Sequence, residues 1–369
     1  MGKRLLAIAT AGLMATGAIT ACDTSGDSSD DGNGGGGAGK PRVGVLLPDS
    51  GGPERFDTDV QKYLQQSFDT AGIPVEIVNA EGDRDDFQKF GKDLVEDNIK
   101  VLIMANLDSI SGQYVIDAAH AKDIPVIDYD RLTLNGGADY YVSFDNQEIG
   151  RQLAYGLVSC IDETGNKTGK TMVAELNGSP TDNRAMQYKA GSDSVLTSLY
   201  DNSTYGKGPD QAVPEDQTDE AGEIFQQMLS QQPKISAVLA ADDDLANEVI
   251  KVLRERKLNG KVPVTGQDAT TVGLRNVLLG DQCLTVYKRI SLEAQTAAYL
   301  AIQLFQGKQP KVPGRLKDPE SGGEVPFVSL VPLPITAAEV KDVVADGFVT
   351  KQDLCTAAFA KLCAQYGVK

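Results

Sequence analysis

Charged side chains follow an apolar segment of this sequence at the point where a buried strand would end. Residues 124–127 (IPVI) lead directly into Asp128, Asp130 and Arg131. A strand usually ends in turn residues such as Gly, Asn or Pro. A carboxylate beside a guanidinium forms several charge-assisted hydrogen bonds at once, and these are stronger than bonds between neutral groups. Such a pair is suited to a ligand that carries many hydroxyl groups.

Charged or amide residues follow six apolar segments, which lie in both halves of the chain. The segments and the residues after them are RVGVLL before PDSGGPERF, IPVI before DYDR, KTMVAEL before NGSPTDNR, ISAVLA before ADDD, VPVTG before QDA, and CLTVY before Lys288. In open parallel α/β sheets, ligands bind beyond the carboxyl ends of the strands. The pattern therefore predicts one polar binding site at that edge. Taken singly, each of these groups is also typical of a turn, a helix N-cap or a surface ion pair.

The elements that must position these residues alternate along the chain. Short apolar segments, which we expect to be strands, are separated by segments of helical periodicity. This alternation predicts doubly wound parallel sheets in two α/β units of similar size. Residues 201–216 are expected to form a polar loop. The expected helices are 57–70, 85–97, 111–121, 147–160, 182–199, 219–230, 244–256 and 271–279.

The N-terminal segment has the features of an export signal. A basic start at Lys3 and Arg4 precedes an apolar stretch that is too short to span a bilayer stably. The stretch ends in AITAC, which resembles the lipobox of bacterial lipoproteins. That resemblance implies that residues 1–22 are a signal peptide and that Cys22 is acylated; an ordinary secretory signal is the alternative. Residues 23–40 are polar and glycine-rich, which predicts a flexible tether.

The remaining composition excludes several functions. The net charge of −17 argues against a nucleic-acid partner. His120 is the only histidine and no CxxC spacing occurs, so no metal site is predicted. Four cysteines in an exported chain favour disulfides, and three pairings are possible. We favour Cys160 with Cys283 and Cys355 with Cys363. The second pair requires a break between its cysteines, since eight residues of helix separate Cα atoms by roughly 12 Å.

The motifs YDR, SFDN, GSPTDN, TGQDA and LTVYK resemble the type I periplasmic sugar-binding proteins of ABC transporters over residues 42–348. The resemblance implies two α/β lobes joined by three crossover strands. These lobes would be residues 41–145 with about 288–327, and 146–287 with about 328–369. It further implies a monomer without enzymatic activity or cofactor. Such a protein would bind a monosaccharide between its lobes and deliver it to the membrane permease and ATPase of an importer.

The resemblance also assigns ligand residues by position. The matched positions are Arg55, Phe56, Asp130, Arg131, Asp182, Arg184, Asp242, Asp268 and Lys288. Xylose is the first choice of sugar, with another aldopentose or an aldohexose as alternatives. Family members stack aromatic rings on both faces of the sugar, but this chain has no Trp. Phe56 matches one wall; the other position falls near Ala212, where Tyr205 is a candidate. The positions of Asp242 and Arg184 hold amides in the family pattern, which favours an ion pair between them here.

Other functions remain to be separated by experiment. A sugar receptor that signals to a sensor kinase or chemoreceptor would have the same site. A glycosidase needs paired carboxylates across a cleft, and acids are plentiful here. A repressor's effector domain is disfavoured by the export signal and by the lack of a helix-turn-helix. The sequence therefore predicts an extracytoplasmic, lipid-anchored sugar-binding protein.

Overall fold

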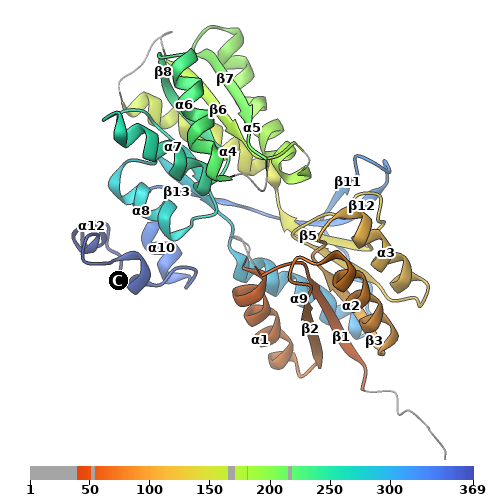
Figure 1. Ribbon diagram of the computed structural model, residues 1–369. Helices are drawn as coiled ribbons and strands as arrows, with labels where there is room; N and C mark the ends of the chain where they lie inside the picture. Colours follow the sequence, from red (N-terminus) through yellow and green to blue (C-terminus); the bar gives the residue numbers. More distant parts are fainter. Residues whose placement is uncertain (1–39, 51–54, 165–170, 181, 215–217) are drawn as a thin grey trace, which may run out of the picture. The chain divides into compact units, whose positions relative to one another are not determined.

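The computed structural model describes residues 40–50, 55–164, 171–180, 182–214 and 218–369 (Figure 1). The expected signal peptide, its Cys22 and almost all of the expected tether lie outside these residues. Within the described ranges, none of the helices is long and apolar enough to cross a membrane.

The first sheet has seven strands in the order β11-β12-β5-β4-β3-β1-β2, and all neighbours are parallel except β11 and β12. The strands are β1 (Arg42–Leu47), β2 (Val75–Asn79), β3 (Ile99–Met104), β4 (Val126–Tyr129), β5 (Tyr140–Phe144), β11 (Gly314–Lys317) and β12 (Glu324–Leu330). Its helices are α1 (Gln61–Ala71), α2 (Arg84–Glu96), α3 (Ser109–His120) and α9 (Ile290–Phe305), with a π-helical turn η1 (Phe56–Val60) before α1. Strands from distant parts of the chain, β5 and β12, thus lie side by side (Figure 1).

The other strands form two three-stranded sheets, ordered β7-β6-β8 and β13-β10-β9, which a bridge between Val238 and Val264 connects. The strands are β6 (Met172–Asn177), β7 (Gly206–Ala212), β8 (Ile235–Ala240), β9 (Thr265–Gln267), β10 (Leu284–Tyr287) and β13 (Leu333–Ile335). The helices are α4 (Asn146–Glu163), α5 (Asn183–Asp201), α6 (Ala221–Gln231), α7 (Asp243–Glu255) and α8 (Thr271–Leu279), with a short 3₁₀ turn η2 (Thr218–Glu220) before α6.

One secondary-structure prediction was wrong. The supposed polar loop 201–216 contains β7, whose sequence GKGPDQA has no alternation of apolar and polar residues. The strand lies at the edge of its sheet and most of its residues are at least partly exposed. An edge strand tolerates proline and glycine and needs no apolar face of its own, so its sequence carries little strand signal.

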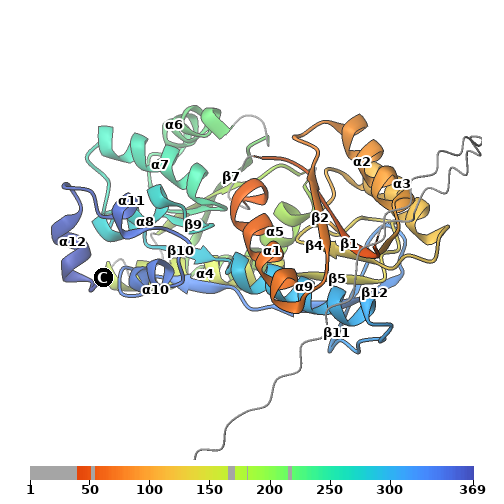
Figure 2. The ribbon, with the colours of Figure 1, turned by 90° about the horizontal axis from the view of Figure 1, so that it is seen from below.

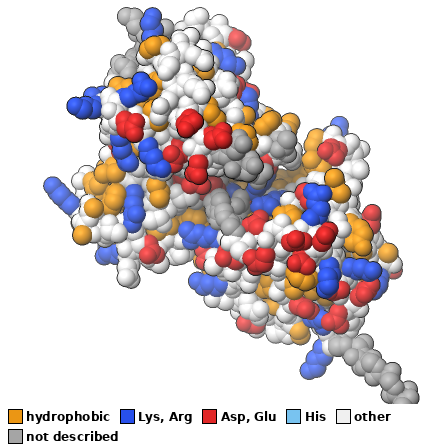
Figure 3. All heavy atoms as spheres, viewed as in Figure 1, with side chains coloured by type: hydrophobic (Ala, Val, Ile, Leu, Met, Phe, Trp, Pro, Cys, Tyr) orange, Lys and Arg blue, Asp and Glu red, His pale blue; other side chains and the backbone are white. Residues whose placement is uncertain are grey.

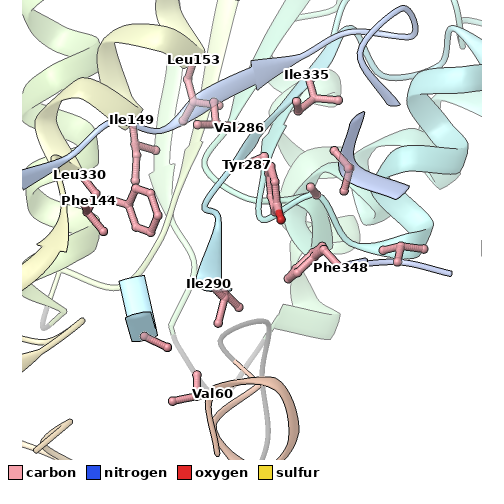
Figure 4. Packing of buried hydrophobic residues seen from close by; sticks show 14 of the residues in the cluster. Val60, Phe144, Ile149, Leu153, Val286, Tyr287, Ile290, Leu330, Ile335 and Phe348 are labelled. Atoms are coloured by element: carbon pink, nitrogen blue, oxygen red, sulfur yellow. The ribbon is translucent and has the colours of Figure 1, made fainter. Parts of the chain in front are cut away.

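The chain passes between the seven-stranded sheet and the other two sheets at three places: after β5, after β10, and between β12 and β13. One hydrophobic core runs through all three passages, and it includes Phe144, Val286 and Leu330 (Figure 4). The three passages are therefore packed against shared neighbours and not exposed as free linkers.

Helix α5 is held close to α4 by two glycines. A Cβ atom at Gly150 would collide with the carbonyl oxygen of Tyr188, and one at Gly191 would collide with that of Gln147. Only glycine allows the two backbones to approach this closely. The contact fixes the position of α5, whose first turn carries Arg184.

The structure pairs Cys160 with Cys283 and Cys355 with Cys363, with Cα–Cα distances of 6.3 and 5.9 Å. The second pair spans a break between α11 (Lys351–Leu354) and α12 (Ala360–Gln365), which brings the two cysteines within bonding distance. These helices lie beside α8, and α10 (Val340–Ala345) precedes them (Figure 2). Arg275 of α8 donates to the carbonyl oxygen of Leu354 at 3.3 Å.

Candidate functional site

A polar cavity of about 390 Å³ lies at the carboxyl ends of strands from different sheets. Figure 3 shows acidic and basic side chains gathered around a hollow on this face of the molecule. Six of the nine ligand residues predicted from the sequence line the cavity: Arg131, Asp182, Arg184, Asp242, Asp268 and Lys288. The structure therefore brings together these six predicted residues, which are up to 157 positions apart in the sequence (131 to 288).

Asp130 lies directly beside this cavity. Its backbone has a positive φ of 58°. That conformation is held by hydrogen bonds, because Asp130 N–H donates to Val142 and Asp130 C=O accepts from the hydroxyl groups of Tyr141 and Ser143. The carboxylate accepts a hydrogen bond from Arg184 Nη1 at 3.1 Å. The strand end after β4 thus presents a rigidly oriented carboxylate toward a helix of the β6 sheet.

Arg131 and Arg184 are each held by acids. Arg131 lies 3.4 Å from Asp49 Oδ2 and 3.9 Å from Asp130 Oδ2. Asp182 is the N-cap of α5 and accepts from the backbone N–H of Arg184 at 2.8 Å, while its other oxygen lies 3.4 Å from Arg184 Nη2. These contacts limit the rotamers of both guanidinium groups.

Asp268 and Lys288 form a buried pair on the opposite wall. Lys288 Nζ lies 3.3 Å from Asp268 Oδ1, and both residues are less than a tenth exposed. The backbone of Asp268 has a φ of 95°, and its N–H donates to Val286 of β10 at 2.8 Å. The side-chain amide of Gln267 also donates to the Asp268 carboxylate. A left-handed backbone conformation in a non-glycine residue is costly and concentrates at functional sites.

Asp242 is half-buried and forms the N-cap of α7, where it accepts from Leu245 N–H at 2.7 Å. Burial, with the nearby charges of Asp268 and Asp244, raises the pKa of Asp242 to about 7. The ion pair expected between Asp242 and Arg184 is not formed among the described residues, since Arg184 pairs with Asp130 and Asp182.

Two of the predicted residues lie below or beside the cavity. Phe56 is fully buried beneath Arg131, whose guanidinium carbon is 5.1 Å from the centre of the ring. With Asp130 and Lys288, it lines a water-sized space of about 10 Å³. Arg55 donates to the carbonyl oxygen of Phe348 at 2.5 Å, lies over its ring at 4.0 Å, and pairs with Asp59. In this structure Arg55 therefore contacts the C-terminal segment, and its role as a sugar ligand stays a prediction.

The cavity also has lining residues that the sequence reasoning did not select, including Asp49, Tyr188, Asp244 and Gln267. Tyr188 follows Arg184 by one helical turn, so both face the same side of α5. That spacing is the feature of the sequence from which Tyr188 could have been predicted as a lining residue. Tyr205, the candidate for the second aromatic wall, is instead buried in the core beside residues such as Val173 and Leu196. Tyr188 is the aromatic residue that the described part of the cavity wall contains.

The described residues contain no group of three or more His, Cys, Asp or Glu side chains arranged to hold a metal ion. Carboxylates, guanidinium groups and an ammonium group thus form the polar wall. Together they offer both acceptors and donors to a ligand with several hydroxyl groups.

Comparison with known proteins identifies the fold and family. Residues 43–309 match the family described as periplasmic binding protein domain. The D-xylose-binding periplasmic protein of Escherichia coli is 30% identical over 303 residues, covering 82% of this chain and 89% of the relative. The multiple sugar-binding periplasmic receptor ChvE of Rhizobium radiobacter is 27% identical over 339 residues, covering 86% and 92%.

Solved structures share the fold at lower identity. A carbohydrate transporter solute-binding protein from Chloroflexus aurantiacus, in complex with D-glucose, has a TM-score of 0.72 at 23% identity, covering 85% of this chain and 98% of that one. The myo-inositol-binding protein of Caulobacter has a TM-score of 0.65 at 21% identity, covering 84% and 97%. These likenesses confirm the predicted class of two doubly wound α/β units. The chain therefore belongs to the type I periplasmic sugar-binding proteins, a family of non-enzymatic binding components of ABC transport.

Proposed function

We propose that this protein binds one monosaccharide in the 390 Å³ cavity and delivers it to the permease and ATPase of an ABC importer. The observation that carries the proposal is the convergence of opposite charges from different sheets on one polar cavity. Asp130 and Arg131 follow β4 of the seven-stranded sheet, whereas Asp268 and Lys288 follow β9 and β10. A sugar hydroxyl both donates and accepts hydrogen bonds, so such a set satisfies it from both sides.

The proposed roles follow the chemistry of each group. Asp130, Asp182, Asp242 and Asp268 would accept hydrogen bonds from the sugar's hydroxyl groups. Arg55, Arg131, Arg184 and Lys288 would donate hydrogen bonds to hydroxyl oxygens, and Phe56 would form part of the floor of the site. Xylose is the first choice of ligand, because two D-xylose-binding relatives are each 30% identical over 82% of this chain.

The lobes proposed for closure are residues 41–145 with about 288–327, and 146–287 with about 328–369. A sugar that contacts both would stabilise the closed arrangement in proportion to its differential affinity for it. The three passages between the sheets support hinge motion about this region, because hinges are short segments that connect packed bodies. We propose that the protein acts as a monomer held outside the cytoplasm by lipid on Cys22.

A panel of pentoses and hexoses tests the proposal by thermal shift, followed by calorimetry on the sugar with the largest effect. Asp130→Ala and Asp268→Ala should each weaken binding on the order of 100-fold, since each removes a charge-assisted acceptor and leaves its partner unsatisfied. Asp117→Ala, on an exposed position of α3, is the matched control and should bind normally. Unchanged affinity in the two cavity variants would refute the site.

A sensing output is the second candidate, because the relative ChvE is named a receptor. The same site would serve a sensor kinase or chemoreceptor. Sugar uptake by cells that lack this protein distinguishes the two functions: loss of uptake supports delivery, and normal uptake with loss of a sugar response supports sensing.

A further inference from the structure

The cavity has more acidic than basic groups in the part of the wall that the structure describes. Five carboxyl groups and three cations line it. The two guanidinium groups are already engaged by Asp49, Asp130 and Asp182. The acids do not form an isolated surface cluster, because they line the same cavity as Arg131, Arg184 and Lys288.

The excess of acid is concentrated on the wall formed by Asp242, Asp244 and Asp268. Lys288 pairs with Asp268 at 3.3 Å. Asp242 and Asp244 have no Lys or Arg within ion-pair distance among the residues described. This wall thus holds two carboxyl groups whose charge is not balanced by a side chain of the described structure.

The N-terminus of α7 does not fully stabilise the negative charge of Asp242. A helix N-terminus stabilises a carboxylate, and Asp242 accepts the backbone N–H of Leu245. Its pKa is nevertheless raised to about 7, first by burial and then by the negative charges of Asp268 and Asp244. The negative charges of Asp268 and Asp244, unlike burial, favour a positive charge beside Asp242.

We propose that the cavity prefers an amino sugar, in which an ammonium group replaces one hydroxyl and pairs with Asp242. This rests on the proposed sugar-binding function and specifies its ligand class. An ammonium has three donors and no acceptor, so it matches a wall of carboxylate oxygens better than a hydroxyl does. Sugars that carry a carboxylate or a phosphate would be repelled by the same wall.

Calorimetry at neutral pH tests this with D-xylose, D-glucose and their monoaminodeoxy derivatives at each ring carbon that carries a hydroxyl, together with the N-acetyl forms. At least one amine should bind about tenfold tighter than its hydroxyl parent, which corresponds to one good ion pair. N-acetylation, which removes the charge but keeps the nitrogen, should abolish the gain.

The decisive variant is Asp242→Asn, which removes the charge and keeps the N-cap oxygen, because Asn caps helices as well as Asp. The ratio of amine to parent affinity should fall to about one or below. The matched control is Asp83→Asn, the same change at the N-cap of α2, which lies outside the cavity and should leave the ratio unchanged.

The outcomes separate the two proposals. If neutral sugars bind and no amine binds tighter than its parent, the preference for amino sugars is refuted and the sugar-binding function stands. If the preference survives Asp242→Asn, the assignment to Asp242 is refuted. If neither neutral nor amino sugars bind, the proposed function fails and the inference fails with it.

Discussion

Arg184 Nη1 lies 3.1 Å from Asp130 Oδ2, so a side chain from the first turn of α5 contacts the carboxylate that follows β4. Helix α5 packs with the β6 sheet and β4 belongs to the seven-stranded sheet, and the side chains of Arg184 and Asp130 are only 14% and 5% exposed. A charge pair that is this well buried is sensitive to the loss of either partner. The contact links two walls of the cavity and therefore couples the arrangement of one to the other.

We expect this coupling to appear in a double-mutant cycle of Asp130→Asn and Arg184→Gln, with sugar affinity measured by calorimetry. Each single variant should weaken binding, but the double variant should lose less than the sum, with an interaction energy of about 0.5–3 kcal/mol. The cycle of Asp130→Asn with Arg254→Gln is the control, since Arg254 pairs with Asp281. Additive losses in both cycles would contradict the coupling.

A second prediction concerns pH and Asp128. This carboxyl group is fully buried, and it accepts from the backbone N–H and the hydroxyl of Thr133 at 2.7 and 2.9 Å. Burial raises its pKa to about 7 from 3.8. Because the folded pKa is above the unfolded one, the contribution to stability is full below about pH 4 and is lost as pH rises through 7.

The free energy of unfolding should fall by about 3 kcal/mol between pH 5 and pH 9 through Asp128 alone. Asp128→Asn, which can still accept hydrogen bonds from Thr133, should remove that part of the decline in the free energy of unfolding. Urea unfolding at both pH values measures it. Asp117→Asn should leave the decline as it is. An identical pH dependence in the Asp128 variant and the unmodified protein would contradict the assignment.

Much of the fold was predictable because acidic N-caps mark the helix starts. Asp83, Asp145 and Asp242 each cap a helix that begins within one or two residues of the predicted start. Strand β7 was missed because an exposed edge strand needs no periodic apolar pattern. The boundaries of the lobes and the acylation of Cys22 remain predictions.

The site was predictable to the extent that it follows strand ends. That rule, with the family motifs, selected Asp268 and Lys288, which the structure pairs. Tyr188 was missed because it lies in a helix, where exposure to a cavity depends on rotation set by packing. Here that rotation depends on the close approach of α5 to α4 at Gly150 and Gly191, and sequence periodicity does not report such a contact.

The two disulfides should differ in their effect on stability. Cys160–Cys283 closes a separation of 123 residues, and Cys355–Cys363 closes one of 8. Loop-closure entropy predicts losses of about 5 and about 2.5 kcal/mol when each pair is changed to Ala. Urea unfolding of the two double variants shows which disulfide contributes more to the free energy of unfolding. Calorimetry should show unchanged sugar affinity in both, since neither pair lines the cavity. Equal losses of stability would show that chain entropy does not dominate.

The last prediction concerns Arg55, which the resemblance assigns to the sugar but which here lies over Phe348. Its guanidinium is 4.0 Å from the centre of that ring. To donate to a ligand in the cavity, Arg55 must give up this contact. Phe348→Leu removes the competing ring and should therefore raise sugar affinity by about 2- to 10-fold, whereas Arg55→Gln should lower it.

Phe359→Leu is the matched control, because Arg275 lies over that ring at 5.3 Å in the same C-terminal region, away from the cavity. It should change stability without changing affinity. If Phe348→Leu weakens binding, the contact supports the site and does not compete with the ligand. If Arg55→Gln leaves affinity unchanged, Arg55 is a structural partner of the C-terminal segment, and the sugar is held by the cavity-lining charges and Asp130 without it.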